Sequence, residues 1–294
     1  MRFTETFIET LKRPHLFFDG ALGTQLQEAG LPAGASPDTW NITHPDVVRG
    51  IHAAYLEAGA NVVTTNTFGS TAPRQKHGPY KPAELAAAGV RLVKEAVAAF
   101  GQPRFIALDI GPLGEFIEPM GELSEEDAVE LFREPIEAGV AEGADCILIE
   151  TMIDLTEALC AVRAAKKYGA GLPVICTLSY DPNGRLMTGA PLESVVAGLE
   201  EAGVDALGCN CGVGPEQLVT LMPRFTACAH VPLVMQPNAG LPEYCDGKTV
   251  YLVGDEAFAA QMKLLADGGI WGLGGCCGTT PGHIAALIQA VSKA

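Results

Sequence analysis

Residues 146–179 read CILIETMIDLTEALCAVRAAKKYGAGLPVICTLS, and this stretch decides the class of fold. It begins with an apolar run at Cys146–Glu150, passes through a helical pattern at Leu155–Tyr168, and ends in a second apolar run at Val174–Ser179. Short, continuously apolar runs are typical of parallel strands that are covered on both faces by helices. The stretch therefore predicts a strand–helix–strand unit within a parallel sheet.

The same alternation recurs along the whole chain. The expected strands are Leu16–Asp19, Val62–Thr65, Phe105–Ile110, Cys146–Glu150, Val174–Ser179, Ala206–Cys209, Leu233–Gln236 and Ile270–Gly274. The expected helices are Pro45–Ala58, Ala83–Phe100, Glu125–Glu142, Leu155–Tyr168, Leu192–Ala202, Pro215–Ala227, Asp255–Ala266 and His283–Val291. Eight such units in 294 residues predict an α/β protein that folds as a single (β/α)8 TIM barrel, with residues 1–294 in one domain.

The details of the sequence favour this barrel over other α/β arrangements. A doubly wound open sheet would carry a glycine-rich phosphate-binding loop after its first strand, and the segment DGALGT at residues 19–24 lacks that spacing. No proline- or serine-rich linker divides the chain. The expected helix Glu125–Glu142 has its own boundary signals, because Ser124 and Asp127 resemble a capping box and Gly143 follows the helix.

Composition narrows the class of function. Hydrophobic residues make up 48% of the chain and charged residues 18%, which is typical of a globular protein with a sizeable core. The formal net charge is −16, from 19 Lys and Arg against 35 Asp and Glu. We therefore expect no binding to nucleic acid or to anionic membranes. The first residues lack the apolar stretch of a signal peptide, and the longest apolar runs are too short to span a bilayer, so we expect a cytoplasmic protein.

In a (β/α)8 barrel the active site lies at the carboxyl ends of the strands. Those positions carry polar, acidic and thiol groups in this sequence, whereas the strand interiors are apolar. The positions are Asp19-Gly20, Asn66-Thr67-Phe68, Asp109, Gly111-Pro112, Glu150-Thr151, Ser179-Tyr180, Asn210-Cys211, Pro237-Asn238-Ala239-Gly240 and Gly275-Cys276-Cys277. This convergence predicts an enzyme rather than a scaffold.

Three cysteines at the strand ends form the strongest pattern. The chain has nine cysteines, and clustered thiols in a reducing compartment favour a metal over disulfides. Cys276 and Cys277 follow the eighth expected strand and Cys211 follows the sixth, so all three reach the same mouth. Zinc binds such thiolates tetrahedrally at roughly 2.3 Å, and a catalytic zinc keeps one position open beside three protein ligands. The flanking glycines would let both adjacent thiols face one point.

Other interpretations of the cysteines remain open at this point. Cys276 and Cys277 could be small core residues or a strained vicinal disulfide. Cys209 is a rival ligand, because a regular strand would point it the same way as Cys211. We assign the metal to Cys211, which is nearer the mouth, and place Cys209 in the packed layer beneath. The remaining cysteines and all six histidines are expected to be structural or surface residues.

The acidic and amide groups are weaker signals. Glu150, at the end of an apolar run, could bind an ammonium group, act as a base or simply be solvated. Asp19 and the pair Asn66-Thr67 could equally serve strand-end turns. Asn238 lies between the two cysteine-bearing strands, where its amide oxygen could fill the fourth zinc position when no substrate is bound.

Several of these segments together resemble the zinc-dependent homocysteine S-methyltransferase family. The segments are DGALGT at 19–24, TNTFG at 65–69, NC at 210–211, PNAG at 237–240 and GGCCGTTP at 274–281. The resemblance runs from Asp19 to His283 and looks closest to the homocysteine-binding module of cobalamin-dependent methionine synthase. The betaine- and S-methylmethionine-dependent branches of the family fit less well at the first segment.

The resemblance implies a site and a chemistry. It implies that zinc is held by Cys211, Cys276 and Cys277, and that the sulfur of homocysteine is the exchangeable fourth ligand. Three thiolates on one dication leave a net charge of −1, so the incoming thiol would bind as a thiolate and stay nucleophilic. The residues expected to bind homocysteine are Asp19, Gly20, Ala21, Asn66, Thr67, Phe68 and Glu150, with Asn238 as the displaceable ligand.

The resemblance also implies a methyl donor. A methyl-corrinoid, methylcobalamin on a separate protein or module, is expected, because this chain has no length for a folate- or corrinoid-binding module. The alternative is a small donor such as S-methylmethionine or betaine. A third possibility, from another class, is a zinc- or thiol-binding module without catalysis. A zinc-free aldolase-type barrel would need a Schiff-base lysine at a strand end, and none of the eight ends carries one.

Overall fold

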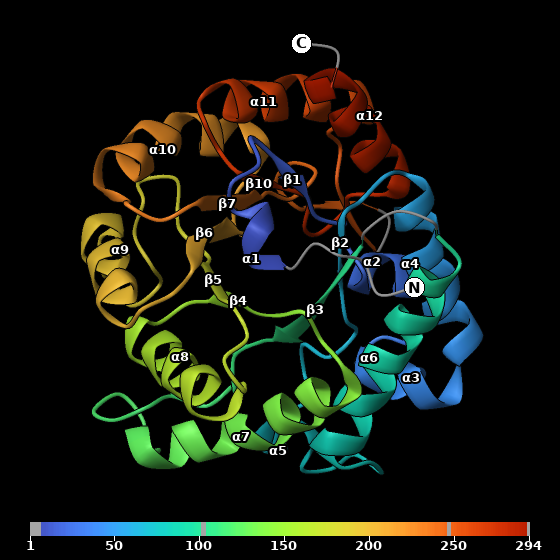
Figure 1. Ribbon diagram of the computed structural model, residues 1–294, viewed down its shortest axis with the longest axis vertical. Helices are drawn as coiled ribbons and strands as arrows, with labels where there is room; N and C mark the ends of the chain where they lie inside the picture. Colours follow the sequence, from blue (N-terminus) through green and yellow to red (C-terminus); the bar gives the residue numbers. More distant parts are fainter. Residues whose placement is uncertain (1–6, 101–103, 246–247, 293–294) are drawn as a thin grey trace.

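The computed structural model describes residues 7–100, 104–245 and 248–292, and its main feature is a ring of eight parallel strands (Figure 1). Around the ring the order is β1–β10–β7–β6–β5–β4–β3–β2. The bounds are β1 Leu16–Phe17, β2 Val62–Thr64, β3 Phe105–Ile110, β4 Cys146–Met152, β5 Val174–Leu178, β6 Ala206–Asn210, β7 Leu233–Gln236 and β10 Gly272–Leu273. A parallel bridge between Phe18 and Val62 joins β1 to β2 and closes the ring. The predicted single (β/α)8 barrel is confirmed.

Each strand is followed by a longer helix on the outside of the ring (Figure 1). These helices are α4 Pro45–Glu57, α6 Pro82–Ala98, α7 Glu125–Glu142, α8 Leu155–Tyr168, α9 Leu192–Glu201, α10 Pro215–Cys228, α11 Asp255–Asp267 and α12 Pro281–Ser292. Shorter elements are α1 Phe7–Thr10, α2 Gly23–Glu28, a 3-10 turn at Pro37–Thr39, α3 Trp40–Thr43, α5 Ala72–Gln75, and a hairpin of β8 Glu243–Cys245 with β9 Lys248–Val250. All of these short elements except α1 lie in loops that follow a strand, and so at the mouth of the barrel.

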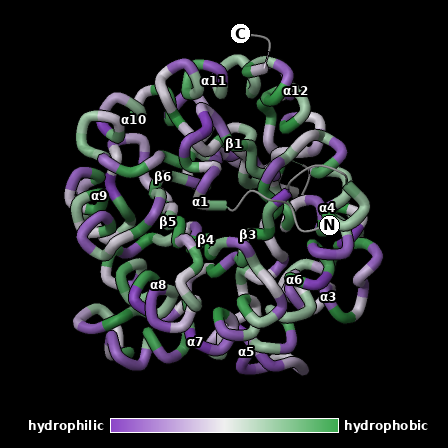
Figure 2. Tube along the Cα trace, viewed as in Figure 1, coloured by the Kyte–Doolittle hydropathy of each residue, from purple (hydrophilic) through white to green (hydrophobic). Residues whose placement is uncertain are grey.

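The core has two layers, one inside the ring and one between the ring and the helices. The inner layer consists of Phe7, Leu16, Phe18, Val62, Phe105, Ala107, Cys146, Leu148, Ile175, Ala206, Val234 and Trp271. Figure 2 shows how the outer helices alternate between hydrophobic and hydrophilic segments, as expected for helices with one buried face. Helix α1 carries Phe7 onto Phe105 and Trp271, edge to face, beside the strand starts. Because this end is filled by side chains, the opposite end of the ring is left for the site.

The expected element boundaries agree closely with the structure. Strands β3 and β7 and helices α7 and α8 match their expected ranges residue for residue. The backbone N–H of Asp127 donates to the Ser124 hydroxyl at 3.1 Å, and α7 is followed by Gly143, whose φ is 103°. The capping and stop signals are therefore confirmed. The hairpin β8–β9, by contrast, lies in a loop where no strands were expected.

Two expectations about side-chain placement are wrong. Glu150 does not end its strand, because β4 continues to Met152 through a shift of register between Ile149 and Met152. Cys209 is fully buried, but it packs with the residues between the ring and the helices, not inside the ring beneath Cys211. The reason is alternation along β6, which directs Ala206 into the ring and Cys209 out of it.

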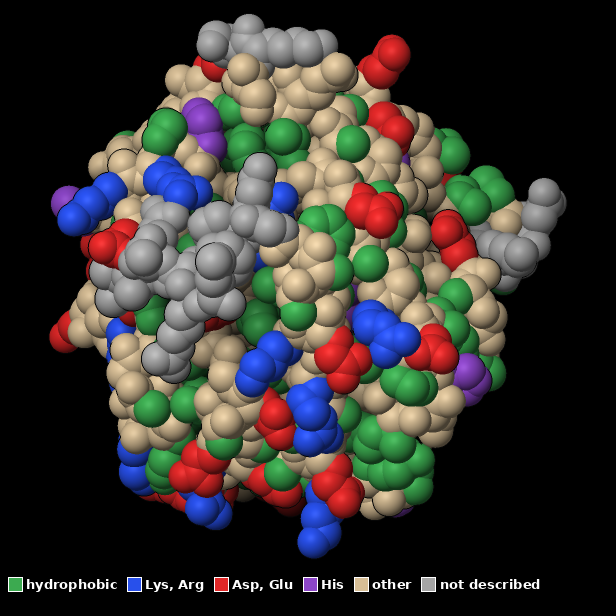
Figure 3. Space-filling model, turned by 45° about the vertical axis from the view of Figure 1, so that its right-hand side comes forward, with side chains coloured by type: hydrophobic (Ala, Val, Ile, Leu, Met, Phe, Trp, Pro, Cys, Tyr) green, Lys and Arg blue, Asp and Glu red, His purple; other side chains and the backbone are tan. Residues whose placement is uncertain are grey.

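On the face drawn in Figure 3, basic and acidic side chains are interspersed, and no extended basic area is visible there. Among the helices of the described residues, none is long and apolar enough to cross a membrane.

A glycine in β6 provides a test of the barrel's packing. A Cβ atom added at Gly208 would lie 1.8 Å from the carbonyl oxygen of Val234 on the neighbouring strand β7. Because backbone in a closed ring has little room to move, Gly208→Ala is expected to lower the free energy of unfolding by about 1–3 kcal/mol. Urea unfolding monitored by circular dichroism measures this change.

The matched control is Gly50→Ala in helix α4, where an added Cβ meets nothing within 4 Å. Alanine there is expected to raise the free energy of unfolding by about 0.5–1 kcal/mol. Equal effects of the two substitutions would contradict this account of β6 and β7.

Candidate metal and substrate site

A cavity of about 330 Å³ opens at the carboxyl ends of the strands. Every strand of the eight-stranded ring except β5 contributes to its wall, either directly or through the loop that follows. The lining residues are Asp19, Gly20, Ala21, Leu22, Gly23, Thr24, Pro37, Thr64, Thr65, Asn66, Phe68, Asp109, Glu150, Thr151, Cys211, Gln236, Gly275, Cys276 and Cys277. Most of the expected site residues therefore meet in one place; Thr67 and Asn238 lie outside the lining.

The three predicted cysteines come together at this cavity. Their sulfur atoms all lie within 4.8 Å of one another, and the Sγ atoms of Cys211 and Cys277 are 3.9 Å apart. Tetrahedral zinc with bonds of about 2.3 Å would separate two sulfur ligands by about 3.8 Å. In the ranges that the structure describes, no other group of three His, Cys, Asp or Glu side chains is close enough to hold a metal. The donor set and its spacing fit zinc.

Local backbone turns, rather than strand geometry, aim these thiols. Regular alternation after Cys209 would also send Cys211 outward, but Cys211 has a φ of 57°, in the left-handed region. On the other side of the mouth, Gly278 has a φ of 79°, and Thr279 donates its hydroxyl to the carbonyl of Cys276 at 2.7 Å. The predicted role of glycine beside the cysteine pair is confirmed at Gly278.

The three thiols share their protons unequally. Hydrogen bonds from Cys276 and Cys277 hold the pKa of the Cys211 thiol far below its usual range. The hydrogen bonds to Cys211 in turn raise the pKa of Cys276 and that of Cys277. One sulfur is therefore disposed to carry negative charge, and a cation at the centre would displace the other two protons.

Asn238 lies behind the thiols. Its side chain is 3% exposed and makes a hydrogen bond to Cys211. Its Oδ1 atom is buried without a hydrogen-bond partner. An unsatisfied oxygen beside three thiols is compatible with the predicted displaceable metal ligand, which stays a prediction.

Three carboxyl groups line the other part of the cavity. Asp19 accepts hydrogen bonds from the backbone N–H of Thr64 at 2.9 Å and from the Thr64 hydroxyl at 2.8 Å, and burial raises its pKa to about 7. Burial raises the pKa of Glu150 to about 8, and the negative charge of Cys211 adds to this shift. Burial, reinforced by Glu150, also raises the pKa of Asp109. Such a group of carboxyls favours a ligand that brings positive charge.

The polar residues of the loop after β2 bond mainly to other parts of the protein and leave few polar groups free for a ligand in the cavity. The Asn66 amide donates to the carbonyl of Pro37 at 2.8 Å and to Asn41 Oδ1 at 2.9 Å, so both of its hydrogens are used within the protein. The Thr67 hydroxyl donates to the carbonyl of Asp109 at 2.7 Å and does not line the cavity. Phe68 does line it.

Sequence reasoning missed three polar residues at the mouth. Asp109 lies at a predicted strand end but is absent from the predicted substrate-binding residues, although its Oδ1 atom is buried without a hydrogen-bond partner. Gln236 Oε1 is buried without a partner as well, and both residues line the cavity. Asn210 is fully buried inside the ring and bonds to Thr151. The available signal was a polar residue within or ending an apolar strand.

A second cavity of about 280 Å³ adjoins the first and shares Phe68 and Thr151 with it. Arg74 also lines it, with its guanidinium 5.5 Å from the centre of the Phe68 ring. The remaining lining residues are Pro112, Gly114, Glu115, Phe116, Ile117, Ile153, Asp154 and Glu157.

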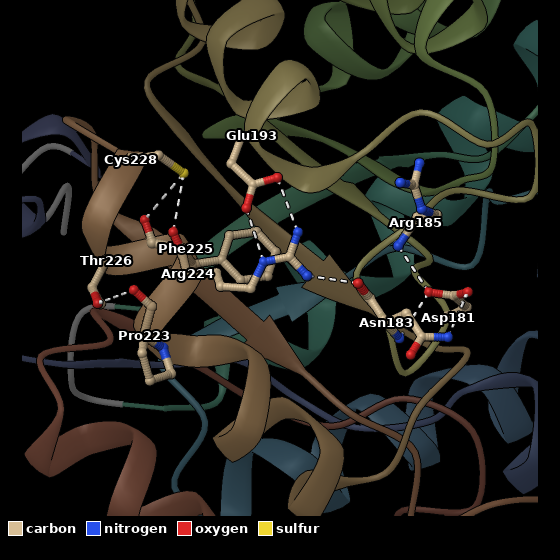
Figure 4. A network of polar contacts seen from close by, with 9 residues as sticks. All are labelled: Asp181, Asn183, Arg185, Glu193, Pro223, Arg224, Phe225, Thr226 and Cys228. Carbon is tan, nitrogen blue, oxygen red and sulfur yellow. Dashed lines mark hydrogen bonds and ion pairs between the residues drawn. The ribbon is translucent and has the colours of Figure 1, made fainter.

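The loop after β5 does not reach the main cavity and is held on the outside (Figure 4). Arg224 of α10 binds both carboxylate oxygens of Glu193 at 2.8 and 2.9 Å, and it donates to the carbonyl of Asn183 at 2.6 Å. Asp181 accepts the backbone N–H groups of Asn183 and Arg185. This network ties the loop to α9 and α10.

Comparisons with known proteins point to one family. A family model described as homocysteine S-methyltransferase matches residues 16–291. The methionine synthases of Mycobacterium leprae and Mycobacterium tuberculosis are each 32% identical over 97% of this chain, which spans about a quarter (25%) of their length. The metallated crystal structure of the homocysteine methyltransferase MmuM from Escherichia coli matches with a TM-score of 0.80 and 25% identity, covering 96% of this chain and 97% of that one.

The buried carboxyls predict a pH dependence of stability. The pKa of Asp19 is about 7 in the folded chain against 3.8 for an ordinary aspartate, so between these values the folded state binds more protons than the unfolded state. Stability from this group therefore falls as pH rises through that window. Relative to Asp19→Asn, which does not titrate, wild type is expected to lose about 1–3 kcal/mol of unfolding free energy between pH 5 and pH 7.

Urea unfolding of metal-free, ligand-free protein at the two pH values measures this difference. Asparagine can still accept a hydrogen bond from the backbone N–H of Thr64, so the substitution removes the titrating group and keeps this contact. If the unfolding free energy depends on pH identically in the two proteins, burial does not raise the pKa of Asp19.

Proposed function

Because the chain belongs to the homocysteine S-methyltransferase family, we propose that it transfers a methyl group to the thiol of homocysteine and so forms methionine. The observation that carries this proposal is the group of three thiols at the open mouth of the barrel, next to a group of buried carboxyls. Cys211, Cys276 and Cys277 would hold zinc, which supplies an open fourth position and stabilises the substrate sulfur as a thiolate at neutral pH.

The chain's own side chains would orient the rest of the substrate. When the sulfur of homocysteine lies beside the three cysteines, the amino-acid end of homocysteine extends toward Asp19, Glu150 and Asp109. A carboxylate in this buried place attracts the ammonium group, whose charge in turn lowers the pKa of the carboxyl. The turn at Gly20 has no room for a side chain, because an added Cβ would lie 2.6 Å from the Thr279 hydroxyl. The backbone of Gly20 and Ala21 therefore forms this side of the cavity.

Catalysis in this proposal rests on position and charge. The barrel is rigid, and a sulfur held in line with a donor methyl group needs no further ordering before the reaction. Asn238 would occupy the fourth metal position before the substrate binds and then give way. Cys211, Cys276 and Cys277 are partly buried, which limits the water that could compete with the substrate sulfur for the donor methyl group.

The proposed donor is a methyl-corrinoid, methylcobalamin carried by a separate protein or module. Support comes from the methionine synthases, in which the matched region is about a quarter (25%) of the length and further segments are therefore present. The partners proposed for this chain are accordingly homocysteine and a corrinoid protein. A cytoplasmic location stays a prediction from the sequence.

A small donor is the second candidate. It is favoured by the match to MmuM, because a homocysteine methyltransferase of that size contains little beyond one barrel. The second cavity adds to it, since Arg74 could bind the carboxylate that S-methylmethionine and betaine both carry.

The proposed ligand set leads to a pair of substitutions. Cys277→Ala is expected to abolish both zinc retention and methyl transfer, because two thiolates do not hold a catalytic zinc tightly. Cys209→Ala, the matched control, removes a buried thiol that faces the helices and is expected to keep about one zinc per chain. Elemental analysis of protein purified under reducing conditions measures both. Full zinc in Cys277→Ala, or loss of zinc in Cys209→Ala, would mean that the ligands are assigned wrongly.

The donor can be identified with a panel of methyl compounds. Zinc-loaded protein with homocysteine is expected to form methionine with a methyl-corrinoid protein and not with free S-methylmethionine or betaine. Methionine is measured by mass spectrometry. Turnover with a small donor would replace the corrinoid proposal by the second candidate, and formation of methionine with any donor would exclude a binding module without catalysis.

A further inference from the structure

We propose that Asn210 is a positioning residue that holds the Glu150 carboxylate in place in the substrate cavity. The proposal rests on the proposed function, because it assumes that Glu150 binds the ammonium group of homocysteine. It assigns a role to a side chain that does not itself line the cavity. Asn210 acts through the backbone and hydroxyl of Thr151, the residue that follows Glu150.

The contacts of Asn210 cross three strands of the barrel. Its side chain is fully buried at the end of β6. The Oδ1 atom accepts the backbone N–H of Thr151 on β4 at 2.8 Å and the hydroxyl of Thr177 on β5 at 2.9 Å. The Nδ2 atom donates to the Thr151 hydroxyl at 2.7 Å. Thr151 is therefore held at two points by one amide, which Thr177 keeps in orientation.

Thr151 needs such support because its backbone is unusual. Its φ is 58°, in the left-handed region that a β-branched residue rarely adopts. The register of β4 against β5 shifts at this point, between Ile149 and Met152. A bulge of this kind leaves a backbone N–H without a partner in the ladder, and a buried N–H requires one. The Asn210 oxygen supplies it.

The bulge decides which side chains face the cavity. Along regular β4, Leu148 faces into the ring and Ile149 faces the helices. Continued alternation would turn Glu150 inward and Thr151 outward. With the extra residue, Glu150 and Thr151 both line the cavity, and Met152 returns to the layer against the helices. Alternation alone therefore turns Glu150 inward, and the bulge brings Thr151 to the cavity beside it. Asn210 accepts the N–H of the peptide that joins Glu150 to Thr151, and so fixes the backbone from which the Glu150 side chain projects.

Only an amide meets all of these demands at position 210. Alanine would leave the Thr151 N–H and the two hydroxyls without their partner. Aspartate would accept from the N–H but could not donate to the Thr151 hydroxyl, and it would add negative charge beside Glu150 and Cys276. The Asn210 Nδ2 atom also lies 3.9 Å from the Cys276 sulfur, so zinc content must be followed in every variant.

The test is a double-mutant cycle on homocysteine affinity, measured by calorimetry with zinc-loaded protein. Asn210→Ala is expected to weaken binding about 10-fold or more in the wild-type background. In a Glu150→Gln background, which already lacks the carboxylate, the same substitution is expected to change affinity less than about 2-fold. In turnover assays the loss is expected in KM rather than in kcat, because an ammonium contact stabilises ground and transition states alike.

Two further variants keep the test decisive if Asn210→Ala does not fold. Thr177→Val removes only the hydroxyl that orients the Asn210 amide, and it is expected to weaken homocysteine binding by about 2- to 5-fold. Thr226→Val, the matched control, removes an exposed hydroxyl that bonds to the carbonyl of Met222 in α10, and it is expected to leave the affinity unchanged.

The outcomes separate this proposal from the proposed function. Additive losses in the two backgrounds, or unchanged affinity in Asn210→Ala and Thr177→Val, would overturn the positioning role while leaving the proposed function intact. Wild-type protein that does not bind homocysteine would overturn both.

Discussion

The rest of the structure depends on closure of the ring between its first two strands. The backbone N–H of Asn61 donates to the carbonyl of Phe17 at 2.7 Å, and that of Asp19 donates to the carbonyl of Val62 at 3.1 Å. These bonds bring the carboxyl ends of all eight parallel strands to one edge. Closure therefore gives Asp19 its bonds to Thr64. The loops after β10 and β6, which carry the three cysteines, lie on either side of β7 in the same ring.

Within this regular frame, the site is built from irregular positions. Cys211 and Thr151 have φ values of 57° and 58°, and each departs from strand geometry at the point where a functional side chain is needed. Such conformations persist only where the surroundings determine them. The surroundings here are neighbouring strands. The backbone carbonyl of Gln236 accepts the N–H of Cys211 at 3.2 Å, and the side-chain oxygen of Asn210 accepts the N–H of Thr151. A rigid barrel can hold several strained turns at one mouth, and these turns aim the Cys211 thiol and bring Thr151 to the cavity beside Glu150.

Most of the polar groups in and around the cavity are acidic groups or hydrogen-bond acceptors, which a nearby positive charge would stabilise. Buried carboxyls at Asp19, Asp109 and Glu150 have raised pKa values, and the unpartnered oxygens of Gln236 and Asn238 add acceptors nearby. A metal ion bound by the three thiols would compensate the negative charge in one part of the cavity. An ammonium group beside the three carboxyls would compensate it in the other part. The proposed zinc and homocysteine supply one cation each, which explains why so acidic a cavity is compatible with binding an amino acid.

The barrel and the group of three thiols could both be predicted from the sequence. Eight apolar runs separated by helical patterns specify parallel strands, and parallel strands in a ring place Cys211, Cys276 and Cys277 at one mouth whatever their separation in sequence. The directions of individual side chains, in contrast, depend on contacts between strands in the folded protein. Alternation predicted that Cys209 and Cys211 point the same way, and the end of an apolar run predicted a strand end at Glu150. Both predictions were wrong, because β6 and β4 end in a left-handed turn at Cys211 and a bulge at Thr151 that hydrogen bonds between strands stabilise. Those bonds join residues far apart in the chain, such as Asn210 and Thr151, and no local pattern encodes them.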